Sequence, residues 1–401
     1  MHAGTVRANL AGRFRDLDLA DDAVGDALMA ATETWTSDTV PRNPAAWLQT
    51  TARNKAIDRL RKAGRVDLIE TDEPSTAGPE TPQRDERGII DADEGEDLGD
   101  QRLRLMLLCC HPAIRPSDQV ALMLRLVAGL TTEEIAAAYV VPRETMVRRI
   151  TRAKDKIRKA RIPLTLGSRI SEREHTALAG IYLIFNEGYL SRGSQRGAHA
   201  PDLCEEAIRL ATIVTSTDDP SAEAIGLLAL MLFVHARRDA RVLNDEIVGL
   251  DDQDRTRWQL TDVHEGNRLL AAALAQMSPG PFQVQALIAS HHSNARIAAD
   301  TDWPAIVALY EQLQLLDTSP VIALNHAVAV GRADGPLAGL EALRSGEELD
   351  DYYAYHLAYA DMLESIERYP DAAAAYTRAL ELTNNGAERV KLRARITALQ
   401  P

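Results

Sequence analysis

The sequence has few aromatic residues, few cysteines and no long hydrophobic run. Aromatic side chains make up 4% of the 401 residues, and there are three cysteines. An odd, small number of cysteines in a chain of this length does not form a disulfide framework and is typical of the reducing cytosol. The chain also lacks the ~18 consecutive apolar residues of a membrane span and the basic-then-apolar start of a signal peptide. We therefore expect a cytoplasmic protein that is neither secreted nor bound to a membrane.

Motifs of catalysis and cofactor binding are also missing. The sequence has no glycine-rich phosphate loop and no nucleophile elbow. The Cys-Cys-His triplet at residues 109–111 lacks a second ligand pair at a zinc-like distance, so packing in a core is favoured over a metal site. His264 and Glu265 resemble the start of a zinc-protease motif, but Arg268 occupies the position of its second histidine. The sequence predicts no enzyme activity, no cofactor and no metal.

Charge is unevenly distributed along the chain. The formal net charge of −14 argues against nucleic-acid binding when taken alone. However, residues 53–65 hold six basic groups against one acid, and residues 143–161 hold nine against two. Two basic islands of this kind are typical of a nucleic-acid-binding protein. Residues 67–100 hold thirteen acids and several prolines, which favours an extended linker because like charges repel.

The spacing of apolar residues predicts helices throughout, because no run alternates with the period of a β-strand. One helix is expected over residues 19–35, with Asp18 or Asp21 as its cap. A second helix is expected over residues 44–62, with Asn43 as N-cap and a proline at its first position. A four-residue row predicts the packing side of this second helix: Leu48, Ala52, Ala56 and Leu60.

Residues 118–159 have the layout of a helix-turn-helix. A first helix begins at Asp118 and is stopped by Gly129. Thr131 and Glu134 form the capping box of a short second helix. After a brief turn, Pro142 opens a longer third helix. Short helix, tight turn and longer helix are the parts of this DNA-binding motif.

The third helix carries an apolar stripe beside a basic sector. The stripe falls within an arc of about 60° and consists of Met146, Ile150, Ala153 and Ile157. A recognition helix has this arrangement, because one stripe docks on its own domain and the other meets DNA. DNA contacts are expected from Arg143, Glu144, Thr145, Arg148, Arg149 and Arg152. The alternative is a solvated charged face.

The C-terminal part of the chain is expected to be helical with short breaks and to contain a repeat. Pro336 and Pro370 are 34 residues apart, as are Ala338 and Ala372. Thirty-four residues is the tetratricopeptide period. A degenerate hairpin of similar shape is expected over residues 281–313. We therefore expect a domain of stacked helical hairpins.

Several stretches resemble RNA polymerase sigma factors. Residues 44–61, PAAWLQTTARNKAIDRLR, resemble sigma region two in order and spacing, and the helix-turn-helix at residues 131–156 is similar to sigma region four. Further matches are LLCCHP at residues 107–112, YLIFNEGY at 182–189 and DQDRTRW at 252–258. These resemble the extracytoplasmic-function subgroup that carries a tetratricopeptide-like C-terminal extension. The resemblance covers nearly the whole chain.

The resemblance implies a transcription initiation factor that binds core RNA polymerase and double-stranded promoter DNA. It assigns the polymerase contact to Asp21, Asp22 and Asp26, for which compensation of the helix dipole is the alternative. The third helix of the helix-turn-helix would read the −35 element. The −10 element would be held by Asn43, Trp47, Arg53, Asn54, Asp58 and Arg61. For Trp47, packing in the core is an equal alternative.

The resemblance also implies four segments with separate roles. They are sigma region two at residues 1–65, an acidic linker at 66–100, sigma region four at 101–161 and the helical extension at 170–401. Eighteen residues precede Leu19, which is short for this family and indicates a truncation or a misassigned start. Relatives carry a polar residue in place of Gly25.

Two polar clusters in the extension are candidates for contact with the sigma domains, a ligand or a regulatory protein. They comprise Asn186, Glu187, Tyr189, Asp254, Arg257 and Trp258. The structural alternative for the first cluster is a helix end with Gly188 in the left-handed cap position. For the second cluster it is a capped helix start with an anchoring tryptophan. The alternative to a sigma factor as a whole is a helical-repeat adaptor, whose helix-turn-helix regulates transcription without polymerase.

Overall fold

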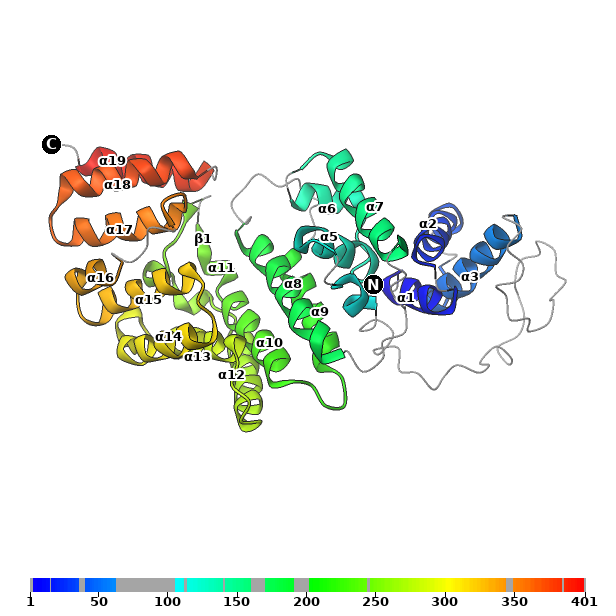
Figure 1. Ribbon diagram of the computed structural model, residues 1–401, viewed down its shortest axis with the longest axis horizontal. Helices are drawn as coiled ribbons and strands as arrows, with labels where there is room; N and C mark the ends of the chain where they lie inside the picture. Colours follow the sequence, from blue (N-terminus) through cyan, green and yellow to red (C-terminus); the bar gives the residue numbers. More distant parts are fainter. Residues whose placement is uncertain are drawn as a thin grey trace. The chain divides into compact units, whose positions relative to one another are not determined.

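The computed structural model of the chain is helical, as predicted (Figure 1). It describes residues 3–14, 16–35, 40–62, 105–111, 114–139, 141–159, 170–190, 202–243, 246–343, 349–383 and 386–399. The only strands in these ranges are an antiparallel pair of two residues each, β1 (Val242–Leu243) and β2 (Glu246–Ile247), with Val242 opposite Ile247. The predicted linker at residues 66–100 lies outside the described residues. The chain divides into two compact units, one within residues 1–183 and the other chiefly within residues 184–401.

The first unit begins with three helices, α1 (Ala3–Phe14), α2 (Leu17–Thr34) and α3 (Pro44–Lys62). Sequence analysis placed no helix before residue 19, so α1 was missed. The predicted caps of α2 were wrong. Asp16 caps this helix, because its extended backbone lets its carboxylate accept hydrogen bonds from two N–H groups of the first turn, each at 3.0 Å. Asp21 lies within α2 and is buried.

Helix α3 has the predicted bounds, cap and packing side. The Asn43 side chain accepts a hydrogen bond from the N–H of Ala46 at 3.1 Å, which satisfies one of the free donors at the start of the helix. α3 packs on α2. Every residue of the predicted row is buried: Leu48, Ala52, Ala56 and Leu60.

The predicted helix-turn-helix is present as α5 (Pro116–Leu126), α6 (Thr132–Ala138) and α7 (Arg143–Lys159). The predicted capping box is confirmed, because Thr131 and Glu134 exchange hydrogen bonds of 2.7 and 3.1 Å between side chain and backbone. The stop after α5 places Gly129 at φ +81°, a conformation that residues with a Cβ rarely adopt. The predicted stripe of α7 faces the core: Met146, Ile150, Ala153 and Ile157.

The helix α8 (Ile170–Leu190) corrects one structural interpretation of the sequence. Gly188 does not end this helix in a left-handed cap, because α8 continues to Leu190. The start of α9 (Leu203–Thr215) approaches α8 at this glycine. A Cβ on Gly188 would lie 2.7 Å from the backbone nitrogen of Cys204 and 2.8 Å from the Cβ of Leu203. The glycine is therefore required by packing.

Replacing Gly188 with alanine should lower the free energy of unfolding of the α8–α9 region by about 1–3 kcal/mol, because the added methyl group meets backbone. The matched control is Gly25→Ala in the interior of α2, where a Cβ would meet nothing within 4 Å. That change should raise the stability of α2 by roughly 0.5–1 kcal/mol. Hydrogen exchange of peptides from each helix measures both effects. Equal stability of Gly188→Ala and the unaltered protein would contradict the packing argument.

The second unit is built from helices that pack on their neighbours in the chain. Its elements are α10 (Ala222–His235), α11 (Arg238–Arg241), α12 (Leu260–Ala275), α13 (Pro281–Asn294), α14 (Trp303–Leu316), α15 (Pro320–Ala333), α16 (Pro336–Leu343), α17 (Tyr353–Ser365), α18 (Tyr369–Leu382) and α19 (Gly386–Leu399), with short 3₁₀ turns η2 (Leu250–Asp252), η3 (Arg255–Arg257) and η4 (Ala298–Asp300). α10 is buried on all sides, against α9, α12 and α13. The later helices follow one another as antiparallel neighbours (Figure 1).

The prolines that are 34 residues apart both open helices, as predicted. Pro336 is the first residue of α16, and Pro370 is the second residue of α18. Proline suits these positions because the first N–H groups of a helix have no partner within it. The small and aromatic residues of the last predicted repeat form a buried core: Ala360, Ala372, Tyr376 and Ala379.

Candidate nucleic-acid and polymerase interface

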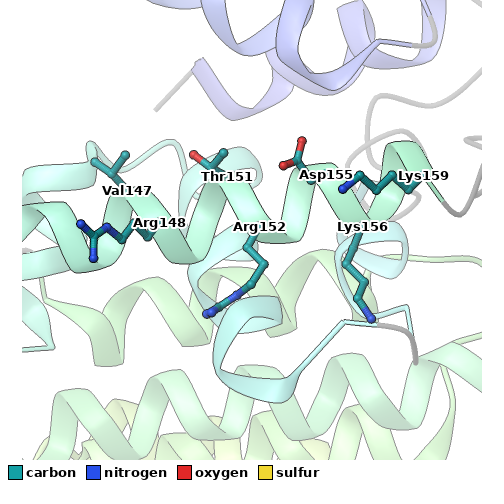
Figure 2. Close-up of a pocket in the computed structure, with 7 residues that line it drawn as sticks. All are labelled: Val147, Arg148, Thr151, Arg152, Asp155, Lys156 and Lys159. Atoms are coloured by element: carbon teal, nitrogen blue, oxygen red, sulfur yellow. The ribbon is translucent and has the colours of Figure 1, made fainter.

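The basic sector of α7 lies at the surface of the first unit. Arg143, Glu144, Arg148 and Arg152 are exposed, and Thr145 and Arg149 are half-buried. Figure 2 shows the side chains of Arg152 and Lys156 on one side of α7, with Val147, Thr151 and Asp155 on the other. A hollow of about 640 Å³ lies along the helix and is lined by Val147, Arg148, Thr151, Arg152, Asp155, Lys156 and Lys159.

Two of the predicted DNA-contacting arginines are fixed by carboxylates. Arg152 donates two hydrogen bonds, of 3.0 and 3.1 Å, to the carboxylate of Asp118 in α5, whose side chain is 4% exposed. Arg143 pairs with Glu133 of α6, and this hydrogen bond raises the pKa of the guanidinium. Within the described residues, Arg148 and Arg149 make no ion pair. A bidentate pair with a buried acid fixes the orientation of the Arg152 guanidinium.

Four of the predicted −10 residues share one face of α3. Trp47, Asn54, Asp58 and Arg61 are spaced by seven, four and three residues, which places them on one stripe of a helix. At roughly 100° per residue, the centre of this stripe lies about 170° from the buried row of α3. Asn43, at the N-cap, precedes the stripe by four residues. Arg53 is half-buried and lies about 110° around the helix from the centre of the stripe.

Trp47 is half-buried and contacts Trp35, which follows the end of α2. The two ring centroids are 5.1 Å apart with an interplanar angle of 64°, an edge-to-face contact. Aromatic pairs prefer this geometry because the positive edge of one ring meets the negative face of the other. The ring of Trp47 is packed on one side and accessible on the other. Its position is therefore compatible both with packing and with a DNA contact.

The three acids that the resemblance assigns to polymerase differ in their surroundings. Asp22 and Asp26 both pair with Arg59 of α3 at 2.8 Å, and their side chains are 58% and 37% exposed. These pairs join α2 to α3 at the surface. Asp21 points to the opposite side and is only 5% exposed.

Asp21 lies among three cations from three other helices. Its carboxylate oxygens lie 2.9 Å from Arg7 of α1, 2.9 Å from Arg125 of α5 and 2.8 Å from Lys154 of α7. Burial alone would raise the pKa of this carboxyl, but the three neighbouring cations outweigh it and hold the pKa below its usual value. Burial lowers the pKa of Arg7 to about 10, although Asp21 opposes this shift. The charged carboxylate is thus required to keep the cations together.

The chain is similar to a known protein over nearly its whole length and to two family models over parts of it. The chain is 37% identical over 390 residues to R00370, an uncharacterized protein of Rhizobium meliloti (strain 1021), with 96% of this chain and 91% of the relative covered. The two proteins therefore belong to one family. Residues 173–274 match a family of unknown function, DUF6596. Residues 1–66 match sigma-70 region 2. The N-terminal part of the chain is a sigma-70 region 2 domain.

The region 2 match covers α1, α2 and α3. It therefore contains both the α3 stripe and the three acids of α2. A region 2 domain supports a role in transcription initiation that involves core RNA polymerase and promoter DNA. The missed helix α1 is part of the matched region.

The two polar clusters of the extension lie in the stretch that matches DUF6596. Asn186, Glu187 and Tyr189 are half-buried residues of α8, and Arg241 stacks on the Tyr189 ring with 3.6 Å from guanidinium to centroid. Asp254 caps the 3₁₀ turn η3, accepting a hydrogen bond from the N–H of Thr256 at 3.0 Å.

The tryptophan that follows this turn is an anchor, as the structural interpretation predicted. Trp258 is 6% exposed, and the guanidinium of Arg255 lies 4.5 Å from the centroid of its ring. Arg257, between them, is exposed. The sequence interpretation was right about the cap and the anchor, and the predicted helix start is a 3₁₀ turn followed by α12.

The Cys-Cys-His triplet contributes to the core of the first unit. Cys109 and Cys110 are both fully buried, and burial raises the pKa of the Cys109 thiol. The Cys110 sulfur lies 3.1 Å from that of Met123 in α5. In the described ranges, no three His, Cys, Asp or Glu side chains are grouped to hold a metal ion. None of the helices described here is both long and apolar enough to cross a membrane.

Sequence reasoning missed Arg7, Arg125 and Lys154 as parts of a site. Arg125 offered a signal, because it interrupts the apolar run of α5, and a charge in such a run is buried only when it is paired. Asp21 offered another, since it lies four residues after Leu17 and three before Val24, both of which are buried. That spacing places Asp21 on the inward face of α2.

Proposed function

We propose that this chain is a sigma factor of the extracytoplasmic-function kind and directs promoter-specific initiation by core RNA polymerase in the cytoplasm. Region two at residues 1–65 would hold the −10 element, and region four at 101–161 would read the −35 element. The acidic linker at residues 66–100 would connect them. The extension at residues 170–401 would be a tetratricopeptide-like domain that regulates the sigma domains in cis or receives a regulatory protein.

The observation that carries this proposal is that α3 and α7 each combine a buried stripe with an exposed polar one. On α3 the stripe opposite the buried row holds four of the residues proposed for the −10 element, Trp47, Asn54, Asp58 and Arg61. On α7 the exposed sector is basic and begins at the N-terminal turn, the part of a recognition helix that reaches base edges. Two such helices with a linker between them suit a promoter with two separated elements.

The surface pair of acids on α2 supports a polymerase contact. Asp22 and Asp26 are held in position by Arg59 and are partly exposed, so a basic partner can reach them. In the extension, stacked hairpins give a surface on which a peptide or protein can lie. The exposed Arg257 and the half-buried Asn186 and Glu187 are the residues proposed for such contacts.

Run-off transcription with purified core polymerase and a library of promoter fragments tests the proposal. We expect the full-length chain to give transcripts from discrete start sites only when core polymerase is present. A variant with Arg148 and Arg149 both replaced by alanine should lose these starts while still binding core polymerase. A folded full-length chain that neither binds core polymerase nor starts transcripts would refute the sigma-factor role. It would favour the helical-repeat adaptor instead.

A further inference from the structure

Three segments of the second unit meet at the C-terminal ends of α10 and α13, which pack on each other (Figure 1). The N–H of Gln259, just after η3, donates a hydrogen bond of 2.9 Å to the carbonyl of Ala236, just after α10. Arg255 of η3 donates from one nitrogen to the carbonyls of His292 and Ala295, each at 2.7 Å. The last carbonyls of a helix have no donor within it, so Arg255 serves as a cap of α13.

Arg237, which follows α10, brings a second guanidinium to this place. Burial lowers the pKa of Arg255, and the charge of Arg237 lowers it further. Burial also lowers the pKa of His292 to about 4, with contributions from Arg237 and Arg255. His292 is therefore a neutral imidazole at neutral pH, and the two guanidiniums are close enough to repel each other.

No carboxylate pairs with either guanidinium in the ranges that the structure describes. Asp300 opposes the fall in the pKa of Arg255 but makes no ion pair with it there. The next arginine along the chain differs, because Arg238 lies 3.4 Å from the carboxylate of Asp262. Two positive charges in a half-buried place are unfavourable unless an anion offsets them.

The same three segments contain buried polar atoms that have no partner among the described residues. These atoms are Nε of Arg237, Nε1 of Trp258 and Oγ of Ser293. Trp258 and Ser293 are 6% and 8% exposed. The guanidinium of Arg255 lies 4.5 Å from the centroid of the Trp258 ring, and Ser293 directly follows His292. Buried donors are normally satisfied, so donors gathered beside two cations indicate a bound group that accepts hydrogen bonds.

The place is accessible to a ligand from solvent. Arg237 and Arg255 are half-buried rather than enclosed, and Arg257 and Arg296, their neighbours in sequence, are exposed. The second unit otherwise carries more acids than bases. Its positive charge is therefore local, and a local concentration of one sign attracts a ligand of the other.

We propose that Arg237, Arg255 and the buried donors beside them bind a phosphate monoester. A phosphate group carries up to two negative charges and several acceptor oxygens, so it balances both guanidiniums. A carboxylate has one charge and would leave one guanidinium unbalanced. The phosphate belongs either to a small molecule or to a phosphorylated side chain of a partner protein. The site lies in the second unit and does not depend on a sigma-factor role of the first.

Inorganic phosphate is the probe for this site. Hydrogen exchange of peptides from η3 and the end of α13 is measured in the full-length chain at neutral pH, with chloride at equal ionic strength as the reference. Phosphate at about ten times its dissociation constant should slow this exchange about tenfold, because it binds only the folded form. The slowing should saturate, unlike the general stabilisation of proteins by phosphate salts. Exchange without a saturable response overturns the proposal.

The variant Arg237→Gln removes one of the two unbalanced charges. Without phosphate, the exchange of α13 should be unchanged or slower, because Arg255 is no longer repelled. Its affinity for phosphate should be at least about tenfold lower than that of the unaltered chain. Faster exchange without phosphate would identify Arg237 as a structural support and overturn the proposal, as would an unchanged affinity. The matched control is Arg268→Gln in α12, an exposed arginine that pairs with Glu265 at 2.6 Å, which should keep the full phosphate effect.

Peptides distinguish the two sources of the phosphate. A peptide that contains phosphoserine is compared with inorganic phosphate and with the same peptide that carries glutamate instead. Binding of the phosphopeptide at least about tenfold tighter than phosphate assigns a phosphorylated protein segment, whereas equal binding assigns a small phosphate ester. In either case the glutamate peptide should bind at least about tenfold more weakly than the phosphopeptide, because its side chain has one charge. Equal binding of the two peptides would rule out a site for a dianion.

Discussion

Replacement of Asp21 by asparagine is expected to lower the free energy of unfolding of the first unit by about 3–5 kcal/mol, the cost of breaking a buried charge pair. The side chain of Arg7 is 2% exposed and is opposed only by Asp21 among the ion pairs of the described residues. Without the carboxylate, Arg7, Arg125 and Lys154 would repel one another in a poorly hydrated space. Asparagine has almost the same shape as aspartate. The loss of unfolding free energy therefore measures the effect of the charge rather than of side-chain volume.

Hydrogen exchange of peptides from α1 and α5 measures this effect within the full-length chain, where the second unit serves as an internal standard. The matched control is Asp22→Asn, which removes a carboxylate that is 58% exposed and should cost less than about 1 kcal/mol. Equal losses from the two variants would show that the burial of Asp21 contributes nothing to stability.

The same carboxyl gives the stability of the first unit a dependence on pH. Its pKa in the folded protein lies below the usual value of 3.8, so the unfolded chain takes up a proton first as the pH falls. The stabilisation is therefore complete above the unfolded pKa and is lost as the pH falls through the folded one. Asp21→Asn should remove this part of the acid sensitivity.

The elements that the sequence predicted well are those with strong local signals. α3 begins with Asn43 and a proline, and the box of Thr131 and Glu134 starts α6. These caps act within one turn, and the apolar periods of α3 and α7 follow from local geometry. The bounds and the buried faces of these helices could therefore be derived without any tertiary information.

The missed features depend on contacts that are distant in sequence. α1 has two glycines and no acid in its first turn, so its local preference for a helix is weak. Its buried side instead packs on α2 and α3, and Arg7 meets Asp21. Gly188 was misread for the same reason, because the segment that excludes a side chain there begins at Leu203. Tertiary contacts override local preference in each case.

The residues of the proposed site also divide into those that local sequence signals place and those whose position depends on tertiary contacts. The helical wheel predicted the buried stripes of α3 and α7 correctly, since it needs only the local period, whereas the DNA contacts of the remaining residues stay a prediction. Sequence reasoning did not separate Asp21 from Asp22 and Asp26, because charge alone does not distinguish a buried acid from a surface one. The inward spacing of Asp21 relative to Leu17 and Val24 was the available signal.

On the proposed promoter, Arg148 and Lys156 should fail in different ways when each is replaced by alanine. Both are exposed on α7, so neither change should disturb folding. Arg148 lies near the N-terminus of the helix, where base edges are reached, and its loss should cost about 1–3 kcal/mol at one base-pair position of the −35 element. Lys156, two turns further on, is placed for a phosphate, and its loss should weaken binding to all sequences alike.

Holoenzyme binding to promoter fragments at several salt concentrations separates the two effects. Lys156→Ala should make the slope of log affinity against log salt less steep by about one, the counterion released by one phosphate contact. Arg148→Ala should change that slope less than Lys156→Ala does. Holoenzyme with Arg148→Ala should, however, no longer discriminate among fragments that differ at a single −35 base pair. If both variants lowered the slope and neither altered discrimination, α7 would contact only the backbone. The −35 reading would then have to come from another helix.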